Sequence, residues 1–240
     1  MRVKKNNPFE AIFHDFINDF GGEVLDEASD ARAADYLFPK QNIIAELKTM
    51  TIDQTEDASQ KLTPYVEAWI KKNNRMPDGS QVNGKFVIEI SKMPPDIQKV
   101  WLKMLKGPAE DLIKQANRQI RDTKERMSLP SAKGMILIAN EANTYHNHPE
   151  SYRRLMAEIL RKRTQTGELR FDHIHAGVYF SLGAVKSRDE NMFFWENLQM
   201  KRTPDEDLTP IVEFQRNLQQ GWYKYIEQAC QITVRQHSKP

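Results

Sequence analysis

Three charged residues in the stretch ADYLFPKQNIIAELKTM have the types and spacing of a metal-dependent hydrolytic site: Asp35, Glu46 and Lys48. If residues 42–48 form a strand, its period of two sends Glu46 and Lys48 to one face. Asp35, on a preceding strand at 34–38, then lies beside Glu46. Converging carboxylates repel each other and lose hydration, which costs several kcal/mol unless a cation lies between them. Such oxygen ligands suit Mg²⁺ or Mn²⁺, and an ion of this kind beside a lysine predicts phosphodiester hydrolysis.

The spacing of an acid two residues before a lysine occurs a second time, at Asp122-Thr123-Lys124. Two copies are what chance alone produces in a chain with this charge content. The second copy lies in a helical pattern, where a step of two residues separates side chains by about 200°. Only the copy at Glu46 has a strand context and an acid on the preceding strand. A surface hairpin joined by salt bridges is the alternative interpretation.

This segment resembles the PD-(D/E)XK nuclease superfamily, whose core runs helix, three antiparallel strands, helix, strand. Asp35 matches the Asp of the second strand, and Glu46 and Lys48 match the signature of the third. Ala34 stands where the motif's name has Pro. A Glu on the first helix often assists metal binding in this superfamily, and Glu10 occupies that place; a first-turn acid favoured by the helix dipole is its alternative interpretation. The resemblance implies a Mg²⁺- or Mn²⁺-dependent nuclease acting on DNA, with Asp35, Glu46 and Glu10 as metal ligands.

Hydrophobic periodicity and turn residues predict one α/β domain over residues 1–240, with a central mixed sheet flanked by helices and with helical insertions. The resemblance makes this a restriction-endonuclease-like core. The predicted helices are 8–20, 57–73, 94–105, 109–127, 150–162 and 208–228, and the predicted strands are 23–28, 34–38, 42–48, 83–91, 135–140, 173–182 and 192–196.

Two interpretations differ over which helix and strand complete the core. Either helix 57–73 and strand 83–91 do so, or residues 51–108 are an insertion and the helix at 109–127 leads into the completing strand. We favour the second, with a C-terminal extension from about residue 185, because members of the superfamily often place Gln or Lys on this helix near the metal. Gln115 and Gln119, four residues apart, share a helix face and are candidates for a phosphate contact or for support of the metal ligands; an exposed polar stripe is the alternative.

Composition excludes several classes of protein. The single cysteine cannot form an intramolecular disulfide, and the apolar runs are far shorter than a membrane span, so we expect a cytoplasmic protein. A net charge of only +2 means that nucleic acid would have to be held by local patches. The strongest candidate patch is RRLMAEILRKR, although a solvated helix face is the more ordinary interpretation; its basic residues are Arg153, Arg154, Arg161, Lys162 and Arg163.

Two further groupings predict other chemistry. His146 and His148, and likewise His173 and His175, have the spacing of a zinc site on a strand, but no cysteine accompanies them. The aromatic segments at 192–198 and 221–228 suit base stacking, a core or a homodimer interface. The main rival to a nuclease is a catalytically silent protein of the same fold that binds nucleic acid or a protein partner.

Overall fold

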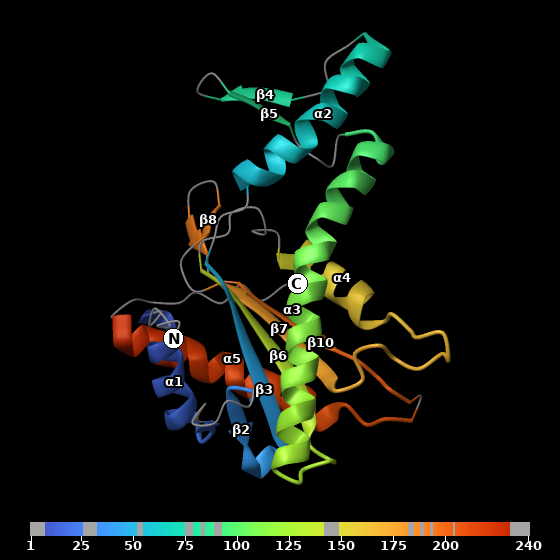
Figure 1. Cartoon of the computed structure of the whole chain (residues 1–240). Helices are drawn as coiled ribbons and strands as arrows, with labels where there is room; N and C mark the ends of the chain where they lie inside the picture. Colours follow the sequence, from blue (N-terminus) through green and yellow to red (C-terminus); the bar gives the residue numbers. More distant parts are fainter. Residues whose placement is uncertain are drawn as a thin grey trace, which may run out of the picture.

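A computed structural model describes residues 8–25, 33–51, 55–74, 79–82, 85–88, 93–141, 149–181, 185–187, 190–192, 194–203 and 205–230. The chain is an α/β protein whose six-stranded mixed sheet lies between helices (Figure 1). No helix in these ranges combines the length and the apolar composition that crossing a bilayer requires.

The helices are α1 (Pro8–Phe20), the 3-10 turn η1 (Pro39–Gln41), α2 (Thr55–Asn73), α3 (Pro95–Arg126), α4 (Pro149–Leu160) and α5 (Thr209–Cys230). The strands are β1 (Glu23–Val24), β2 (Tyr36–Phe38), β3 (Ile43–Met50), β4 (Gly79–Val82), β5 (Lys85–Ile88), β6 (Lys133–Asn140), β7 (Ile174–Ser181), β8 (Val185–Ser187), β9 (Glu190–Met192) and β10 (Trp195–Gln199).

The main sheet has the strand order β1-β2-β3-β6-β7-β10. Strands β1, β2 and β3 form an antiparallel meander, β3, β6 and β7 are parallel, and β10 returns antiparallel to β7. The parallel pairs need helical crossovers, which α3 and α4 supply. In the part of the chain that the structure describes, β6 is the strand that follows β3 in the sheet order, while β4 and β5 pair with each other in a separate hairpin.

Alternation along β3 divides the core into two layers. Ala45 and Leu47 join the layer that packs under α1 and α5, whereas Ile44 joins the layer under α3 and α4. Figure 1 shows α1 in blue and α5 in red on one side of the sheet, away from the green α3. By the same alternation Glu46 and Lys48 belong to the face that α3 covers.

The prediction of two helices at 94–105 and 109–127 is wrong, because a single helix, α3, runs through Gly107 and Pro108. Proline removes one backbone donor and crowds the preceding turn. Both residues are exposed, so the lost hydrogen bond is open to water, while Ala109 and Ile113 immediately beyond them pack into the core. Packing on the sheet thus outweighs the local signal for a break.

Other observed element boundaries differ from the predicted ones by a few residues. The last strand of the sheet is β10, which begins at Trp195 and not at residue 192, because Trp195 and Leu198 are its buried side chains. The predicted strand at 23–28 is described only at Glu23–Val24, and that at 83–91 only at Lys85–Ile88. The remaining residues of these two predictions lie outside the described ranges.

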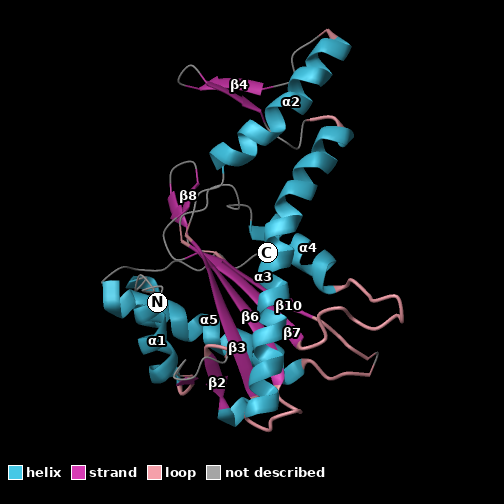
Figure 2. Cartoon of the chain, viewed as in Figure 1, coloured by secondary structure: helices cyan, strands magenta, loops and turns pink. Residues whose placement is uncertain are grey.

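Helix α2, the β4–β5 hairpin and the first turns of α3 stand beyond the end of the main sheet (Figure 2). Leu62 of α2 packs with Met93 and Ile97 in a small core of their own, apart from the two layers on the sheet. This separate core stabilises the segment that runs from the end of β3 to the first turns of α3.

Candidate acidic site on the central sheet

The site is built on the β2–β3 pair. Tyr36 lies opposite Ala45, so the register continued by one residue sets Asp35 opposite Glu46. Asp35 Oδ2 accepts a hydrogen bond from the backbone N–H of Leu47 at 2.7 Å. The carboxyl groups of Asp35 and Glu46 lie close enough for the charge of Asp35 to raise the pKa of Glu46. The expected convergence of the two acids is therefore present, at the point where the β2–β3 ladder ends.

Glu46 is the member of the pair whose negative charge burial disfavours. Its exposed fraction is 1%, and its Oε2 has no hydrogen-bond partner among the described residues. Burial raises the pKa of Glu46 to about 8, with a further upward contribution from Asp35, which outweighs the opposing effect of Lys48. Near neutral pH the Glu46 carboxyl consequently retains its proton unless an additional positive charge approaches.

Lys48 reaches the same point from two residues further along β3. Its Nζ donates to Glu46 Oε1 at 2.5 Å and to Gln119 Oε1 at 2.8 Å. The amide of Gln119 is oriented by its other end, because its Nε2 donates to the carbonyl oxygen of Ala33 at 3.1 Å. Gln119 on α3 thereby joins the lysine to the segment that precedes β2.

Glu10 lies elsewhere. Its Oε1 is 3.4 Å from the hydroxyl of Thr49, whose side chain alternates to the face of β3 opposite Glu46 and Lys48. Among the described residues, Glu10 and the acidic pair act together on Tyr36, where burial first, and then the charges of Asp35, Glu10 and Glu46, raise the pKa of the phenol. The structure therefore does not bring Glu10 into contact with the other two acids.

The donor set fits a hard divalent cation in its chemistry, though with few protein ligands. Among the described residues, no group of three or more His, Cys, Asp or Glu side chains is arranged to hold a metal. Mg²⁺, however, is commonly bound through one or two carboxylates, with water and substrate phosphate completing its shell. The buried, unpartnered Glu46 Oε2 beside Asp35 is the position that would receive such an ion.

The remaining predicted residues of α3 and α4 differ in their surroundings. Gln119 is half-buried at the site, whereas Gln115 is exposed and no hydrogen bond is recorded for it. A step of four residues leaves the two glutamines on the same side of α3, but only Gln119 reaches the sheet. The prediction for Gln119 therefore has a structural counterpart, and that for Gln115 has none.

Most of the basic candidates are engaged within the chain. Arg153 pairs with Glu196 at 3.3 Å, Arg154 with Glu150 at 2.8 Å, and Lys162 with Glu110, while Arg163 donates to the carbonyl oxygen of Gly167 at 2.6 Å. Arg161 is exposed. These pairings reduce the net field that the segment presents to a polyanion, because each cation has a local counter-charge or acceptor.

The histidine and aromatic groupings are structural where they are described. His175 accepts a hydrogen bond from the backbone N–H of Gly134 at 3.0 Å, and no described neighbour completes a zinc site around it. His146 and His148 lie outside the described residues. Trp195 and Trp222 are buried in the core layer under α1 and α5, which favours a packing role over base stacking.

Two residues of the site's surroundings were missed by the sequence argument. Tyr36 adjoins Asp35 in sequence, but its hydroxyl is buried without a partner among the described residues, and alternation along β2 was the signal that could have drawn attention to it. Thr123 accepts a hydrogen bond from the backbone N–H of Ala34 at 2.7 Å and so anchors the entry to β2. No local sequence pattern predicts that hydrogen bond, because its two residues are 89 positions apart in the chain.

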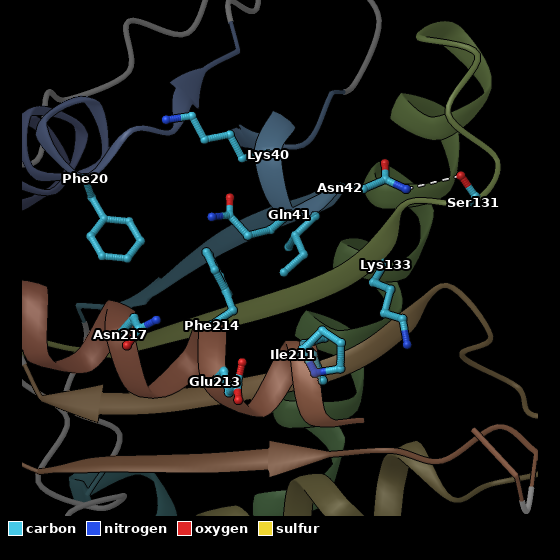
Figure 3. A pocket seen from close by; sticks show the side chains of 12 residues that line it. Phe20, Lys40, Gln41, Asn42, Ser131, Lys133, Ile211, Glu213, Phe214 and Asn217 are labelled. Carbon is cyan, nitrogen blue, oxygen red and sulfur yellow. Dashed lines mark hydrogen bonds between the residues drawn. The ribbon is translucent and has the colours of Figure 1, made fainter. Parts of the chain in front are cut away.

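A pocket of about 450 Å³ lies away from the acidic pair, between the turn that precedes β3 and the start of α5 (Figure 3). Lys40, Lys133 and Phe214 are among its lining residues, and an Asn42–Ser131 hydrogen bond of 3.2 Å closes one edge. It contains none of the predicted catalytic residues.

A scan against family models finds no match for the chain, and searches of curated proteins and of solved structures find none either. The functional argument therefore depends on the geometry and chemistry of the site.

Proposed function

We propose that this chain is a metal-dependent nuclease of the PD-(D/E)XK type, which hydrolyses phosphodiester bonds, with DNA as the expected substrate. The observation that supports this most strongly is the β2–β3 register, which sets Asp35 opposite Glu46, together with the Lys48 amine 2.5 Å from Glu46 Oε1. Glu46 is moreover buried, with an oxygen that has no partner among the described residues. The succession of α1, the β1–β3 meander, α3 and β6 agrees with the core that the resemblance implies.

In this proposal Asp35 and Glu46 hold Mg²⁺ or Mn²⁺, and Lys48 acts on the substrate side. The ion, when bound, supplies Lewis acidity and lowers the pKa of a bound water. Lys48 then orients that water or offsets the charge that develops on the phosphate. Gln119 is a positioning residue, because it holds the Lys48 amine through one end of its amide and the Ala33 carbonyl through the other.

One specific observation favours the silent alternative, a protein of this fold that binds nucleic acid or a protein partner. Glu46 is almost fully buried, and both its proton and the Lys48 ammonium already occupy its carboxyl group without an ion. In the active protein, metal binding must compete with that contact. Metal titration and cleavage assays together separate the two functions.

The direct test is cleavage of a panel of plasmid, linear and branched DNAs, with an RNA arm, in Mg²⁺ or Mn²⁺ against an EDTA control. We expect metal-dependent cleavage by the wild type and its loss in Asp35→Asn. In Lys48→Ala we expect a fall by a factor on the order of 10² with metal binding retained. Lys224→Ala, which removes an exposed lysine from α5, is the matched control and should cleave normally.

A metal-induced rise in melting temperature that Asp35→Asn abolishes, without cleavage of any substrate, would favour the silent alternative. If neither metal binding nor cleavage depends on Asp35, the nuclease proposal fails. Wild-type cleavage by Lys48→Ala would remove Lys48 from the mechanism.

A further inference from the structure

Helix α2 presents an exposed tyrosine between two lysines. Among the described residues, the exposed large hydrophobic side chains are Ile12, Tyr65 and Leu102, and Tyr65 is the aromatic one, with an exposed fraction of 50%. Lys61 and Lys72, on the same helix, are exposed as well. A tyrosine ring carries a large apolar area, which is why this residue is enriched at binding surfaces. The ring of Tyr65 is therefore an apolar surface open to another molecule.

Helical spacing brings these three side chains to one side of α2. Each residue advances by about 100° round the helix axis, so Lys61, Tyr65 and Lys72 fall within an arc of about 40°. Ala68, which is exposed beside this arc, is too small to cover the ring. The acid among the described side chains of α2 is Glu67, and it lies about 200° from Tyr65. We call Lys61, Tyr65 and Lys72 the outer face of α2.

Another side of α2 fixes the outer face to the rest of the molecule. Leu62 is buried with Met93 and Ile97, and Trp69 packs against this small core from the same helix. Helix α3 carries Ile97 and continues as one helix to Gln119, which contacts the acidic site. The outer face is therefore supported by the same helix that reaches the acidic site.

The outer face also lies a short length of chain away from the acidic site. Strand β3 ends at Met50, two residues after Lys48, and α2 begins at Thr55. Five residues of extended chain span at most about 18 Å, and the part of α2 that leads to Tyr65 adds about 15 Å. Figure 1 shows the cyan α2 beyond the end of the main sheet. A polymer that spans about 33 Å therefore contacts both positions.

We propose that the outer face of α2 binds a single-stranded segment of nucleic acid, with a base stacked on Tyr65 and nearby phosphates paired with Lys61 and Lys72. Proteins that hold single strands combine cations along the backbone with aromatic rings that stack the bases. In a duplex the bases already stack on each other, so the ring favours the single strand. The two lysines are separated by about 17 Å of helix, which corresponds to about five nucleotides of backbone.

This inference rests on the proposed nuclease function in one respect, namely that nucleic acid is the polymer bound. The experiment therefore measures binding in EDTA, where metal-dependent cleavage cannot occur. The full chain is titrated against a labelled single-stranded oligonucleotide of about 20 nucleotides, longer than the site of one such platform, and against a duplex of the same sequence. Fluorescence anisotropy reports the affinity. We expect the single strand to bind more tightly than the duplex at the same salt concentration.

Variants of Tyr65 test the stacking contact. Tyr65→Ala should weaken single-strand binding by about tenfold or more, because one base stack is lost, whereas Tyr65→Phe keeps the ring and should bind as the wild type does. The matched control is Leu102→Ala, which removes a similarly exposed side chain from α3. Leu102 lies about 140° round α3 from Ile97, the residue that packs with α2, so this variant should bind normally.

A variant of Lys72 tests the phosphate contact. Lys72→Gln should reduce the slope of log affinity against log salt concentration by about 0.7, the value for one phosphate contact on a single strand. Lys224→Gln, which removes an exposed lysine from α5, should leave that slope unchanged. A slope in Lys72→Gln equal to that of the wild type would remove this lysine from the outer face's contacts and contradict the inference.

The remaining outcomes separate this inference from the nuclease proposal. Unchanged affinity in Tyr65→Ala, or tighter binding of the duplex than of the single strand, would overturn the inference even if the wild type cleaves DNA. Displacement of the oligonucleotide by polyglutamate at equal concentration of charge would assign the outer face to an acidic protein and would overturn it as well. Binding that depends on Tyr65, without cleavage of any substrate, would leave the inference standing and refute the nuclease proposal alone.

Discussion

The replacement Glu46→Gln tests the electrostatics of the acidic site directly. Glutamine has nearly the shape of a protonated glutamate but cannot ionise, so it preserves the packing of the site and removes the charge. Because the exposed fraction of Glu46 is 1%, the ionised carboxyl is poorly hydrated in the folded state and well hydrated in the unfolded state. The variant should therefore differ from the wild type chiefly at high pH.

The size and sign follow from the raised pKa. Folding raises the pKa of Glu46 from 4.5 to about 8, so the folded state holds this proton more tightly than the unfolded state. The stabilisation that this proton provides is complete below pH 4.5 and is lost as the pH rises through about 8. The shift corresponds to a change of about 5 kcal/mol at most, and about 3 to 5 kcal/mol once the structure relaxes around the charge.

The assay is urea unfolding in EDTA at pH 5, 7 and 9, for the wild type, Glu46→Gln and the control Glu213→Gln, whose parent residue is exposed on α5. The free energy of unfolding of Glu46→Gln relative to the wild type should rise steadily across this range, whereas that of the control should not. Parallel pH dependences for the wild type and Glu46→Gln would show that Glu46 has no raised pKa, and the account of the site would be refuted.

Three substitutions test the framework around the site by the same unfolding measurement. Tyr36→Phe removes a buried hydroxyl that has no described partner, so it should be neutral or stabilising, and a loss above about 1 kcal/mol would reveal a partner for that hydroxyl. Thr123→Val leaves the buried N–H of Ala34 without its acceptor and should cost about 1 to 3 kcal/mol; an unchanged stability would contradict that hydrogen bond. Gly134→Ala should prevent stable folding, because the new Cβ would lie 2.0 Å from the backbone oxygen of His173, and a folded variant of normal stability would refute that close approach.

The local elements were largely predictable, because each depends on a pattern that neighbouring residues carry. Helix α1 has the predicted bounds, and β3 and β6 form where the apolar runs indicated. A break in α3 was wrongly predicted at Gly107 and Pro108. These two residues do favour a helix end locally, but the packing of the residues that follow them keeps the helix continuous. A single sequence contains no measure of that packing energy, which arises from the sheet.

The proximity of Asp35 and Glu46 was predictable in kind from the same patterns. Period-two alternation and a short turn set the antiparallel register, and that register sets the two acids opposite each other. The degree of burial of Glu46 was not predictable, because it depends on packing against α3, a helix that lies many residues further along the sequence. The position of Glu10 was unpredictable for a related reason. Its carboxylate lies beside the hydroxyl of Thr49, on the sheet face opposite Glu46.

By itself the sequence determined the α/β class, the strand that carries Glu46 and Lys48, and the chemistry that two acids and a lysine can support. Tertiary structure alone decided that Gln119 holds the lysine and that Thr123 anchors Ala34. The physical reason is the range of the interactions. Periodicity and turn chemistry act over a few residues, whereas burial and charge act through space between segments that only the folded chain brings together.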